Sequence, residues 1–569
     1  MATVKKGKSS ASTPEELRDM MWAAADKLRG SMNAADYMNF VLGLIFLKYV
    51  SDSFDACALQ IKQELIDEGY EGEELDEELE VSLKDPDSFY GEGVYFVPEK
   101  ARWGYITNFA KTDNIGEVLD AAMREIMEQN DRLRGALSEI YNKENVDQRR
   151  LAGLIDLFSN ADFKGIREQT GRSSQDVLGE VYEYFLGKFA AKQGQRGGEF
   201  YTPRSVVRTL VDILEPVDGK LYDPCCGSGG MFVQSEKFVE QHGAYFKQEK
   251  GYEPALMVYG QELNDQTWRL ARLNLAIHGI FGELGDRWAD TFTEDKHAGT
   301  NFDYVLANPP FNLKDWDRRT DDPRWNFGVP PVRNANYAWL QHIWSKLNAG
   351  GSAAVVLANG SMSSNTGGEN TIREEMVRGD AVAAMIALPA NLFLGTAIPV
   401  CVWVLAKDKG AGKRGKNDRK GEILMIDARD MGHMVDRTTR TFSDEDVAKI
   451  AGTWHRWRGT DSELNTGEYE DVAGFTRSVS VKDVEAEGWA LTPGRYVGSA
   501  AVVEDGEPVE VRIARLREKL SVQFAESQRL AEVVQKNLAS LGLPPVPADI
   551  EDDGLGQDAA AGVAEGEVK

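Results

Sequence analysis

Short apolar runs alternate with segments of helical periodicity from about residue 199 to about residue 430. We expect the apolar runs to be strands, over residues 220–222, 258–261, 303–306, 352–357, 381–388 and 400–405. Strands that alternate with helices along the chain are typical of a mainly parallel sheet. The pattern therefore predicts an α/β fold for this part of the chain.

The 569 residues exceed the length of one ordinary domain. A capping box at 13–16, helical spacing from Ala34 and an amphipathic stripe over 175–189 indicate helices. We assign 1–165 to a helical N-terminal domain, 166–500 to the α/β domain, 505–543 to a C-terminal helix, and 544–569 to an acidic, disordered tail. The apolar stripe of the C-terminal helix, which runs over about 511–541, serves either packing within the chain or a partner.

Two charged segments need separate interpretations. The acidic stretch 64–87 interrupts the helical N-terminal pattern and is expected to be solvated or disordered. The basic, glycine-rich segment 407–420 lies between two expected strands, where we favour a solvated hairpin loop over a phosphate contact. The formal net charge is −27, and Lys and Arg supply most non-specific affinity for nucleic acid. A chain of this charge needs a basic partner to hold DNA well.

No metal site or membrane segment is predicted. The four cysteines, at 57, 225, 226 and 401, form no C-x-x-C pair and no histidine-linked spacing. The densest apolar run, 40–50, is short and contains Lys48, so we expect a buried helix there. The N-terminal lysines are followed by no apolar region of the signal-peptide type. These features favour a cytoplasmic protein with free thiols.

The most informative motif is Asn308-Pro309-Pro310-Phe311, directly after the apolar run 302–307. Two prolines end a strand because they lack the backbone donor and fix φ. Asn308 would then lie at the carboxyl end of a parallel strand, where α/β sheets bind ligands. Its side-chain carbonyl and the Pro309 carbonyl can accept both N–H groups of an exocyclic base amine, and Phe311 offers a stacking face. The alternative is a Pro-Pro turn that only ends a strand.

A glycine-rich loop follows the first expected strand, at Asp223-Pro-Cys-Cys-Gly-Ser-Gly-Gly230. Gly227, Ser228, Gly229 and Gly230 let backbone approach a ligand at a helix N-terminus. The loop has neither the Lys-Ser/Thr of a P-loop nor a complete G-x-G-x-x-G. Glu262 ends the next strand, where an acid can bind ribose hydroxyls, and Asp290 precedes the strand before Asn308. Taken singly, each acid fits an ordinary surface position better than a binding site, and its value lies in the order of glycine loop, two acids and Asn-Pro-Pro-Phe.

The segment Gly198-Glu-Phe-Tyr-Thr-Pro-Arg204 precedes the glycine loop. Thr202 and Pro203 have the form of a cap and first turn for a helix over 204–214. The aromatic pair Phe200 and Tyr201 can instead line the pocket of a cofactor's methionine part.

The ordered set GEFYTPR, DPCCGSGG, GQELN, ADTF and NPPF resembles the amino-methyltransferases of the γ arrangement. The wider sequence resembles the modification subunit of type I restriction–modification systems, through 17–30, 41–52, 334–339, 356–364, 387–393 and 426–434. The match spans nearly the whole chain. The glycine loop departs slightly, since Cys225 and Cys226 occupy places often held by small residues.

The resemblance implies a seven-stranded class I (Rossmann-like) core and S-adenosylmethionine as cofactor. The cofactor residues implied are Glu199, Phe200, Tyr201, Thr202, Pro203, Arg204, Asp223, Gly227, Ser228, Gly229, Gly230, Glu262 and Asp290. Asn308, Pro309, Pro310 and Phe311 would be catalytic, acting on adenine N6 of a base extruded from duplex DNA. The family further implies two such subunits with one DNA-specificity subunit, to which a restriction subunit can add.

Four other functions stay open at this point. A glutamine methyltransferase acting on proteins shares the Asn-Pro-Pro-aromatic signature but lacks the GEFYTPR element. A self-contained DNA methyltransferase would need a target-recognition domain, for which the chain after Leu405 leaves little room. A non-catalytic subunit would bind the cofactor only as a structural or sensory ligand. Transfer to cytosine N4 uses the same geometry, although Asn308 and Phe311 resemble the adenine group more.

Overall fold

The computed structural model describes residues 34–143, 146–159, 174–193, 202–393 and 397–499, with isolated positions nearer the two ends. The chain forms two compact units, residues 1–500 and 501–569. In the second unit, Leu520, Phe524 and Leu530 are helical and exposed. The rest of the predicted C-terminal helix and the tail lie outside the described residues, as does the capping box at 13–16.

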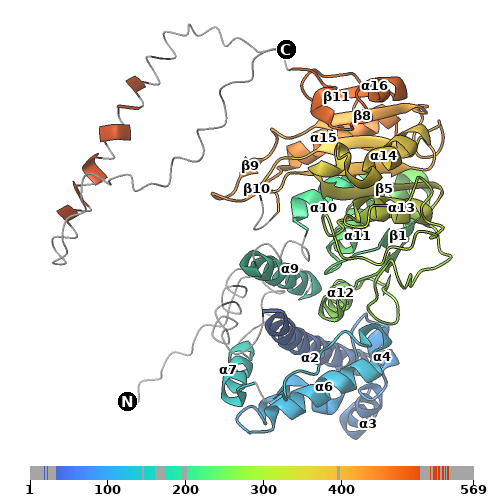
Figure 1. Ribbon diagram of the computed structural model, residues 1–569. Helices are drawn as coiled ribbons and strands as arrows, with labels where there is room; N and C mark the ends of the chain where they lie inside the picture. The colour runs from blue at the N-terminus through green and yellow to red at the C-terminus, as the bar shows by residue number, and fades with distance from the viewer. Residues whose placement is uncertain are drawn as a thin grey trace, which may run out of the picture. The chain divides into compact units, whose positions relative to one another are not determined.

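One nine-stranded sheet organises the first unit, in the order β11-β8-β6-β7-β5-β4-β1-β2-β3 (Figure 1). Strand β7 runs antiparallel to β5 and β6, β11 runs antiparallel to β8, and the other neighbours are parallel. The strands are β1 Gly219–Asp223, β2 Leu256–Gly260, β3 Gly282–Glu283, β4 Phe302–Ala307, β5 Leu347–Ala358, β6 Val382–Ala387, β7 Val400–Ala406, β8 Glu422–Asp427 and β11 Thr476–Ser480. All six predicted strands are present, and β8 and β11 extend the expected seven-stranded core.

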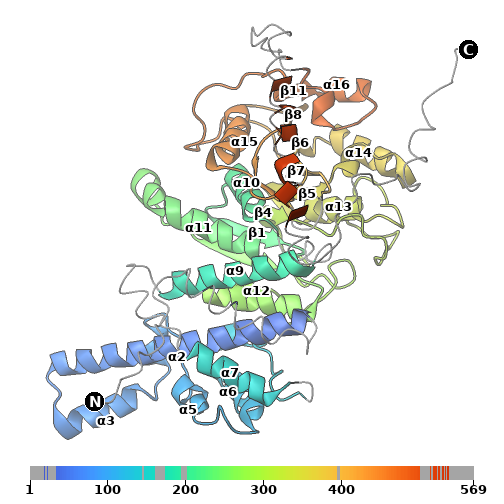
Figure 2. The same cartoon turned by 90° about the vertical axis from the view of Figure 1, so that its left-hand side faces the viewer.

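Helices cover both faces of the sheet, because its central strands are apolar on both sides. Figure 2 shows α10, α11 and α15 on one side and α13, α14 and α16 on the other. Leu221 and Tyr222, adjacent in β1, belong to different core clusters on these two sides. These helices are α10 Arg204–Leu214, α11 Gly230–Tyr245, α13 Asn336–Lys346, α14 Glu369–Arg378, α15 Asp444–Arg458 and α16 Val481–Ala486.

The helical domain is built around the long helix α2, and the helices predicted from Ala34 and over 175–189 are both present. Its helices are α2 Ala34–Glu68, α3 Gly72–Ser82, α4 Asp87–Tyr90, α5 Trp103–Thr107, α6 Ile115–Gln129, α7 Gln148–Phe158 and α9 Ser174–Gln193. Part of the acidic stretch 64–87 is thus ordered helix, so disorder is the wrong interpretation there. Helix α3 has no buried residue, which agrees with the solvated alternative.

Helix α12, Asp265–Ile277, packs against both domains. Leu270, Leu273 and Ile277 belong to the core of the helical domain. Trp268 and Leu275, on the same helix, belong to the core beneath the sheet. The two domains therefore share this helix, which begins just after Glu262.

Short elements complete the described chain. They are the 3-10 turns η1 Glu99–Ala101, η2 Asp131–Leu133, η5 Asn359–Met362, η6 Thr366–Gly368 and η7 Pro493–Arg495, the π-helical turn η4 Phe246–Lys250, and the hairpin strands β9 His433–Met434 and β10 Arg440–Thr441. Among the described residues, no helix combines the length and apolarity needed to span a membrane. Within the same residues, no group of three or more His, Cys, Asp or Glu side chains is placed to hold a metal ion.

The segment 407–420 is not a hairpin loop, because β6 lies between β7 and β8 in the sheet. Lys409 is 1% exposed, and its Nζ donates to the carbonyls of Val382 and Glu422 at 3.0 and 2.7 Å. Arg414 donates to the carbonyl of Asp303 at 3.0 Å. These basic side chains stabilise the crossover over β6, which sequence periodicity could not reveal. A phosphate contact by this segment stays a prediction.

Candidate active site

Asp223, Glu262 and Asn308 follow three neighbouring parallel strands at the same edge of the sheet. Strands β1 and β2 pair with Asp223 opposite Gly260, and β1 and β4 pair with Tyr222 opposite Val305. Neighbouring strands lie about 4.8 Å apart. The glycine loop, the acid after β2 and the Asn-Pro-Pro-Phe segment after β4 therefore share one crevice edge, where α/β sheets bind ligands.

The glycine loop is fastened to the end of β2 and opens helix α11. The backbone N–H of Cys226 donates to the carbonyl of Gln261 at 2.9 Å, and Gln261 donates back to Asp223 at 3.0 Å. Gly227 and Gly229 have φ of 55° and 79°, in the left-handed region that favours glycine. Gly229 is also the N-cap of α11. The turn thus presents backbone N–H groups at the positive end of a helix.

Glu262 joins the glycine loop to the start of α12. One carboxylate oxygen accepts the backbone N–H of Gly227 at 3.1 Å, and the other accepts that of Asn264 at 2.9 Å. Burial raises the pKa of Glu262, while these backbone donors lower it in part. Because each carboxylate oxygen has two lone pairs, the fixed group keeps acceptor capacity for a pair of hydroxyls.

Asp223 lies beneath the glycine loop and is 2% exposed. Burial raises the pKa of its carboxyl to about 7, against the lowering effect of the Cys225 N–H, which donates to Oδ1 at 3.0 Å. Its role is to shape the loop, since a carboxyl in this position keeps the turn after β1 closed.

Asp223→Asn is expected to change how stability depends on pH. The folded chain holds this proton more tightly than the unfolded chain, whose value is 3.8. Ionisation therefore removes stability as the pH rises from about 4 to about 7, by a total of a few kcal/mol at ~1.4 kcal/mol per pKa unit. Across this pH window the melting temperature of the wild type should fall relative to that of Asp223→Asn. Above the window the difference between the two melting temperatures should stay constant. If the melting temperatures of the two proteins changed with pH in the same way, the raised pKa assigned to Asp223 would be wrong.

Asp290 is half-buried beside the same edge. Ala289 donates to the Glu262 carbonyl at 2.9 Å, and the backbone N–H of Phe292 donates to Asp290 Oδ1 at 2.7 Å. Arg324 was not predicted as part of this site. Its guanidinium donates to the carbonyls of Thr291 and Phe292 at 2.9 and 2.8 Å. Arg324 therefore fixes the loop that carries Asp290.

Asn308 has one satisfied and one unsatisfied side-chain atom. Its Nδ2 donates to Thr202 Oγ1 at 3.0 Å. Its Oδ1 is buried and has no hydrogen-bond partner among the described residues. A buried amide oxygen without a donor is costly, so this atom is poised to accept an N–H from a bound group. Thr202 was predicted as a cap or a cofactor contact, but its bond to Asn308 was not predicted, because the two residues lie far apart in sequence.

The aromatic ring of Phe311 is held by contacts on either side of its loop. It meets Phe393 edge to face, with centroids 5.9 Å apart, and is itself only partly buried. Asn312, at φ 54°, exchanges two 3.0 Å hydrogen bonds with the buried Asn336 at the start of α13. Pro309 is buried and Pro310 half-buried. These contacts fix the conformation of the segment, and the Phe311 ring stays partly exposed.

The segment before α10 is only partly described. Glu199, Phe200 and Tyr201 lie outside the described residues, so their predicted cofactor contacts stay predictions. Helix α10 begins at Arg204, as predicted, but Pro203 is its N-cap and no side chain caps it. Thr202 is thus not the cap. Its hydroxyl is used by Asn308 instead.

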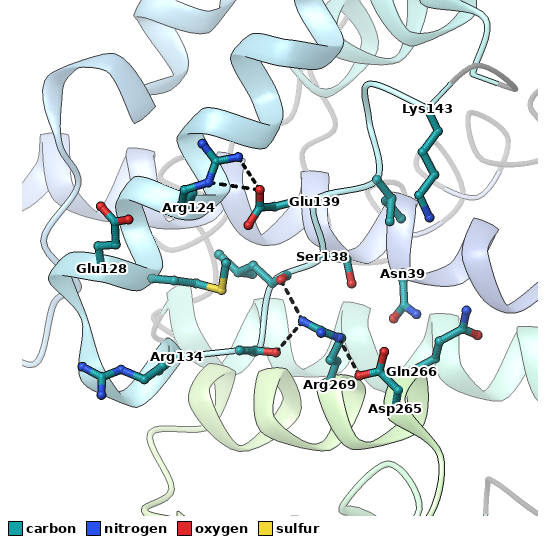
Figure 3. A pocket seen from close by; sticks show the side chains of 14 residues that line it. Asn39, Arg124, Glu128, Arg134, Ser138, Glu139, Lys143, Asp265, Gln266 and Arg269 are labelled. Carbon is teal, nitrogen blue, oxygen red and sulfur yellow. Dashed lines mark hydrogen bonds and ion pairs between the residues drawn. The ribbon is translucent and has the colours of Figure 1, made fainter. Parts of the chain in front are cut away.

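A cavity of about 620 Å³ lies away from this edge, between residues 134–143 and the start of α12 (Figure 3). Arg269 donates to the carbonyls of Gly135 and Leu137 and pairs with Asp265 at 2.9 Å. Arg124 pairs with Glu139 across the same cavity. Arg124 and Arg269 in this cavity are paired with neighbouring carboxylates. We therefore interpret the cavity as a polar contact region between the helical domain and α12.

Two protein-family models together match most of this chain. The N-6 DNA Methylase family model matches residues 173–505, and the HsdM N-terminal domain model matches residues 17–158. The type I restriction enzyme HindI methylase subunit of Haemophilus influenzae is 41% identical, over 78% of this chain and 100% of that protein. The MjaIX methylase subunit of Methanocaldococcus jannaschii is 35% identical, over 93% of this chain and 92% of that protein.

Solved structures agree. The type I restriction-modification system methyltransferase subunit from Streptococcus thermophilus superposes with a TM-score of 0.67 at 26% identity. The match covers 85% of this chain and 100% of that subunit.

Proposed function

Because the chain belongs to the N-6 DNA methylase family, as a modification subunit of the type I restriction–modification kind, we propose that Asn308, Pro309 and Phe311 hold the target adenine. The reaction of such a subunit is site-specific methylation of DNA at adenine N6. The proposal concerns which residues of this chain perform it. The unsatisfied Oδ1 of Asn308 carries the assignment.

The crevice edge fits S-adenosylmethionine. Gly227 and Gly229 have left-handed backbone conformations and no side chains. A ligand can therefore approach the backbone at the start of α11 closely. The fixed carboxylate of Glu262 suits ribose hydroxyls, and Asp290 has an oxygen beyond the one bound by Phe292 for an adenine amine. Glu199, Phe200, Tyr201, Thr202, Pro203, Arg204, Asp223, Ser228 and Gly230 complete the proposed cofactor contacts.

The cofactor supplies an electrophilic methyl group on a sulfonium. The adenine amine is a poor nucleophile because its lone pair is delocalised into the ring. Asn308 Oδ1 and the Pro309 carbonyl accept its two N–H groups and so favour a tetrahedral nitrogen. Phe311 stacks on the extruded base, which leaves the duplex at a cost of a few kcal/mol. Positioning and exclusion of water would then promote direct displacement. The bond from N6 to the methyl carbon would form as the sulfur–carbon bond breaks, a neutral thioether would leave, and N6 would lose one proton to solvent.

We further propose that the active assembly contains two copies of this chain, one DNA-specificity subunit and, for cleavage, a restriction subunit. The net charge of −27 supports a requirement for a partner that holds DNA.

Purified chain should therefore transfer labelled methyl groups to unmethylated host DNA only when its specificity subunit is added. The product should be N6-methyladenine at one recurring sequence, detected by nucleoside analysis and modification-sensitive sequencing. Methylation of a defined site by the chain alone would favour a self-contained enzyme. Recovery of N4-methylcytosine, or no transfer by the complex, would contradict the proposal.

A further inference from the structure

A small hairpin projects from the sheet-containing part of the first unit (Figure 1). Strands β9 and β10 pair with Arg440 opposite Met434 and Thr441 opposite His433. Residues 433–438 are all exposed. Met434 and Val435, 42% and 64% exposed, place apolar side chains in water at the tip. Adjacent exposed apolar residues on a projecting element are typical of a contact surface.

The hairpin arises at the same sheet edge as the candidate active site. Strand β8 runs parallel to β6, with Asp427 opposite Ala387, and both run in the direction of β4. The chain leaves β8 at this edge and enters the hairpin directly. Its carboxyl-terminal strand returns beside the loop after β6, where the backbone N–H of Arg440 donates to the carbonyl of Asn391 at 2.8 Å.

The loop after β6 connects the hairpin to the proposed base pocket. Phe393, two residues beyond Asn391, contacts Phe311 edge to face. Met431 and Phe442, at the two ends of the hairpin, pack in the same core cluster as these rings. The hairpin base is therefore anchored beside the ring on which the target base would stack, and the exposed tip lies beyond this base.

Arg437 is the cation of the tip that can reach a phosphate. Arg437 has no carboxylate partner among the described residues, and His433 is exposed. Asp436, the one acid between the two strands, is bound internally by the backbone N–H groups of Thr438 and Thr439 at 2.7 and 2.8 Å. Arg440 donates to the carbonyls of Met431 and Gly432, which holds the base of the hairpin closed.

We propose that the hairpin 431–441 contacts the DNA duplex beside the extruded adenine, with Arg437 on a phosphate and Met434 and Val435 against the groove. A two-stranded ribbon fits the major groove, which is about 12 Å wide. Arginine side chains on phosphates fix the register of a protein on DNA. The inference rests on the proposed function, since it takes the Phe311 pocket as the site of the base.

The test measures the affinity of the complete complex, with its specificity subunit, for a labelled DNA duplex. The duplex contains the recognition site at which the complex methylates DNA, and the salt concentration is varied between about 50 and 200 mM. Arg437→Ala should weaken binding by about 10-fold at about 50 mM salt, where a phosphate contact contributes most, and reduce the slope of log K against log salt by about 0.9. Val435→Ser should weaken binding with the slope unchanged. Both residues are exposed, so the fold is expected to be retained.

Lys482→Ala is the matched control. Lys482 is exposed in α16, which follows Ser480 opposite Glu422 at the start of β8, and so lies at the other edge of the sheet. This variant should bind DNA as the wild type does.

Three outcomes decide the matter. Wild-type affinity and slope for Arg437→Ala would overturn the proposal, as would an equal loss for Lys482→Ala. Loss of the specificity subunit from the Arg437→Ala complex, read by native mass spectrometry, would make the hairpin a subunit contact and also overturn it. Failure of the wild-type complex to methylate would count against the proposed function, whereas the salt slope tests the hairpin independently of methyl transfer.

Discussion

Asn308→Ala is expected to lower the rate of methyl transfer by at least about 100- to 1000-fold, the range for loss of one hydrogen-bonding group that acts on the reacting centre. The variant removes the unsatisfied Oδ1 that would accept an N–H of the adenine amine. Affinity for S-adenosylmethionine should change by no more than several-fold, because Asn308 is not among the proposed cofactor contacts, of which the glycine loop and Glu262 follow β1 and β2. Single-turnover transfer and calorimetric cofactor binding measure the two effects separately.

Thr202 provides the companion experiment. Thr202→Val keeps the side-chain volume but removes the hydroxyl that accepts Asn308 Nδ2 at 3.0 Å. Transfer should fall by about 10-fold, the effect of roughly 1.4 kcal/mol, and Thr202→Ser should restore it. Near-normal transfer by Asn308→Ala would remove the basis of the catalytic assignment, whatever Thr202 does.

Glu262→Gln should weaken cofactor binding by about 100-fold or more. The carboxylate accepts N–H groups from Gly227 and Asn264 on its two oxygens. The amide of glutamine would turn a donor toward one of these N–H groups and lose the charge that strengthens bonds to ribose hydroxyls. Each bond to a charged group contributes roughly 1.5–3 kcal/mol, and 1.4 kcal/mol is a factor of ten.

Glu283→Gln is the control for Glu262→Gln. Glu283 ends the neighbouring strand β3, is exposed, and accepts the backbone N–H of Gly285 through Oε1. Cofactor affinity should be unchanged in this variant. If Glu262→Gln bound S-adenosylmethionine as tightly as the wild type, the ribose assignment would be wrong and the glycine loop alone would have to hold the cofactor.

Local patterns were sufficient to predict the strands and the position of the main motifs. Strand runs such as 302–307 are continuous apolar segments, and the prolines after Asn308 mark where the strand ends. Contacts between distant segments could not be predicted in this way. The bond from Asn308 to Thr202 and the support of Phe292 by Arg324 depend on strand order and loop path, which periodicity does not encode.

Two of the wrong interpretations have the same origin. The segment 407–420 was expected to be a hairpin because it joins consecutive strands, but β6 lies between them. Charge suggested disorder for 64–87, yet α2 continues through its first residues and α3 forms without burying any side chain. In both segments, composition indicated polar residues that are partly exposed, but it did not predict the backbone conformation or the strand order.

The packing of α12 limits how this chain can be divided or recombined. One side of the helix completes the helical domain through Leu270 and Leu273, and another completes the sheet domain through Trp268 and Leu275. Removing the helical domain would expose the apolar side of α12 to water. The first turn of α12 lies next to Glu262 in the chain. A chimera with the helical domain of a relative would consequently need matching substitutions along α12 to pack both cores.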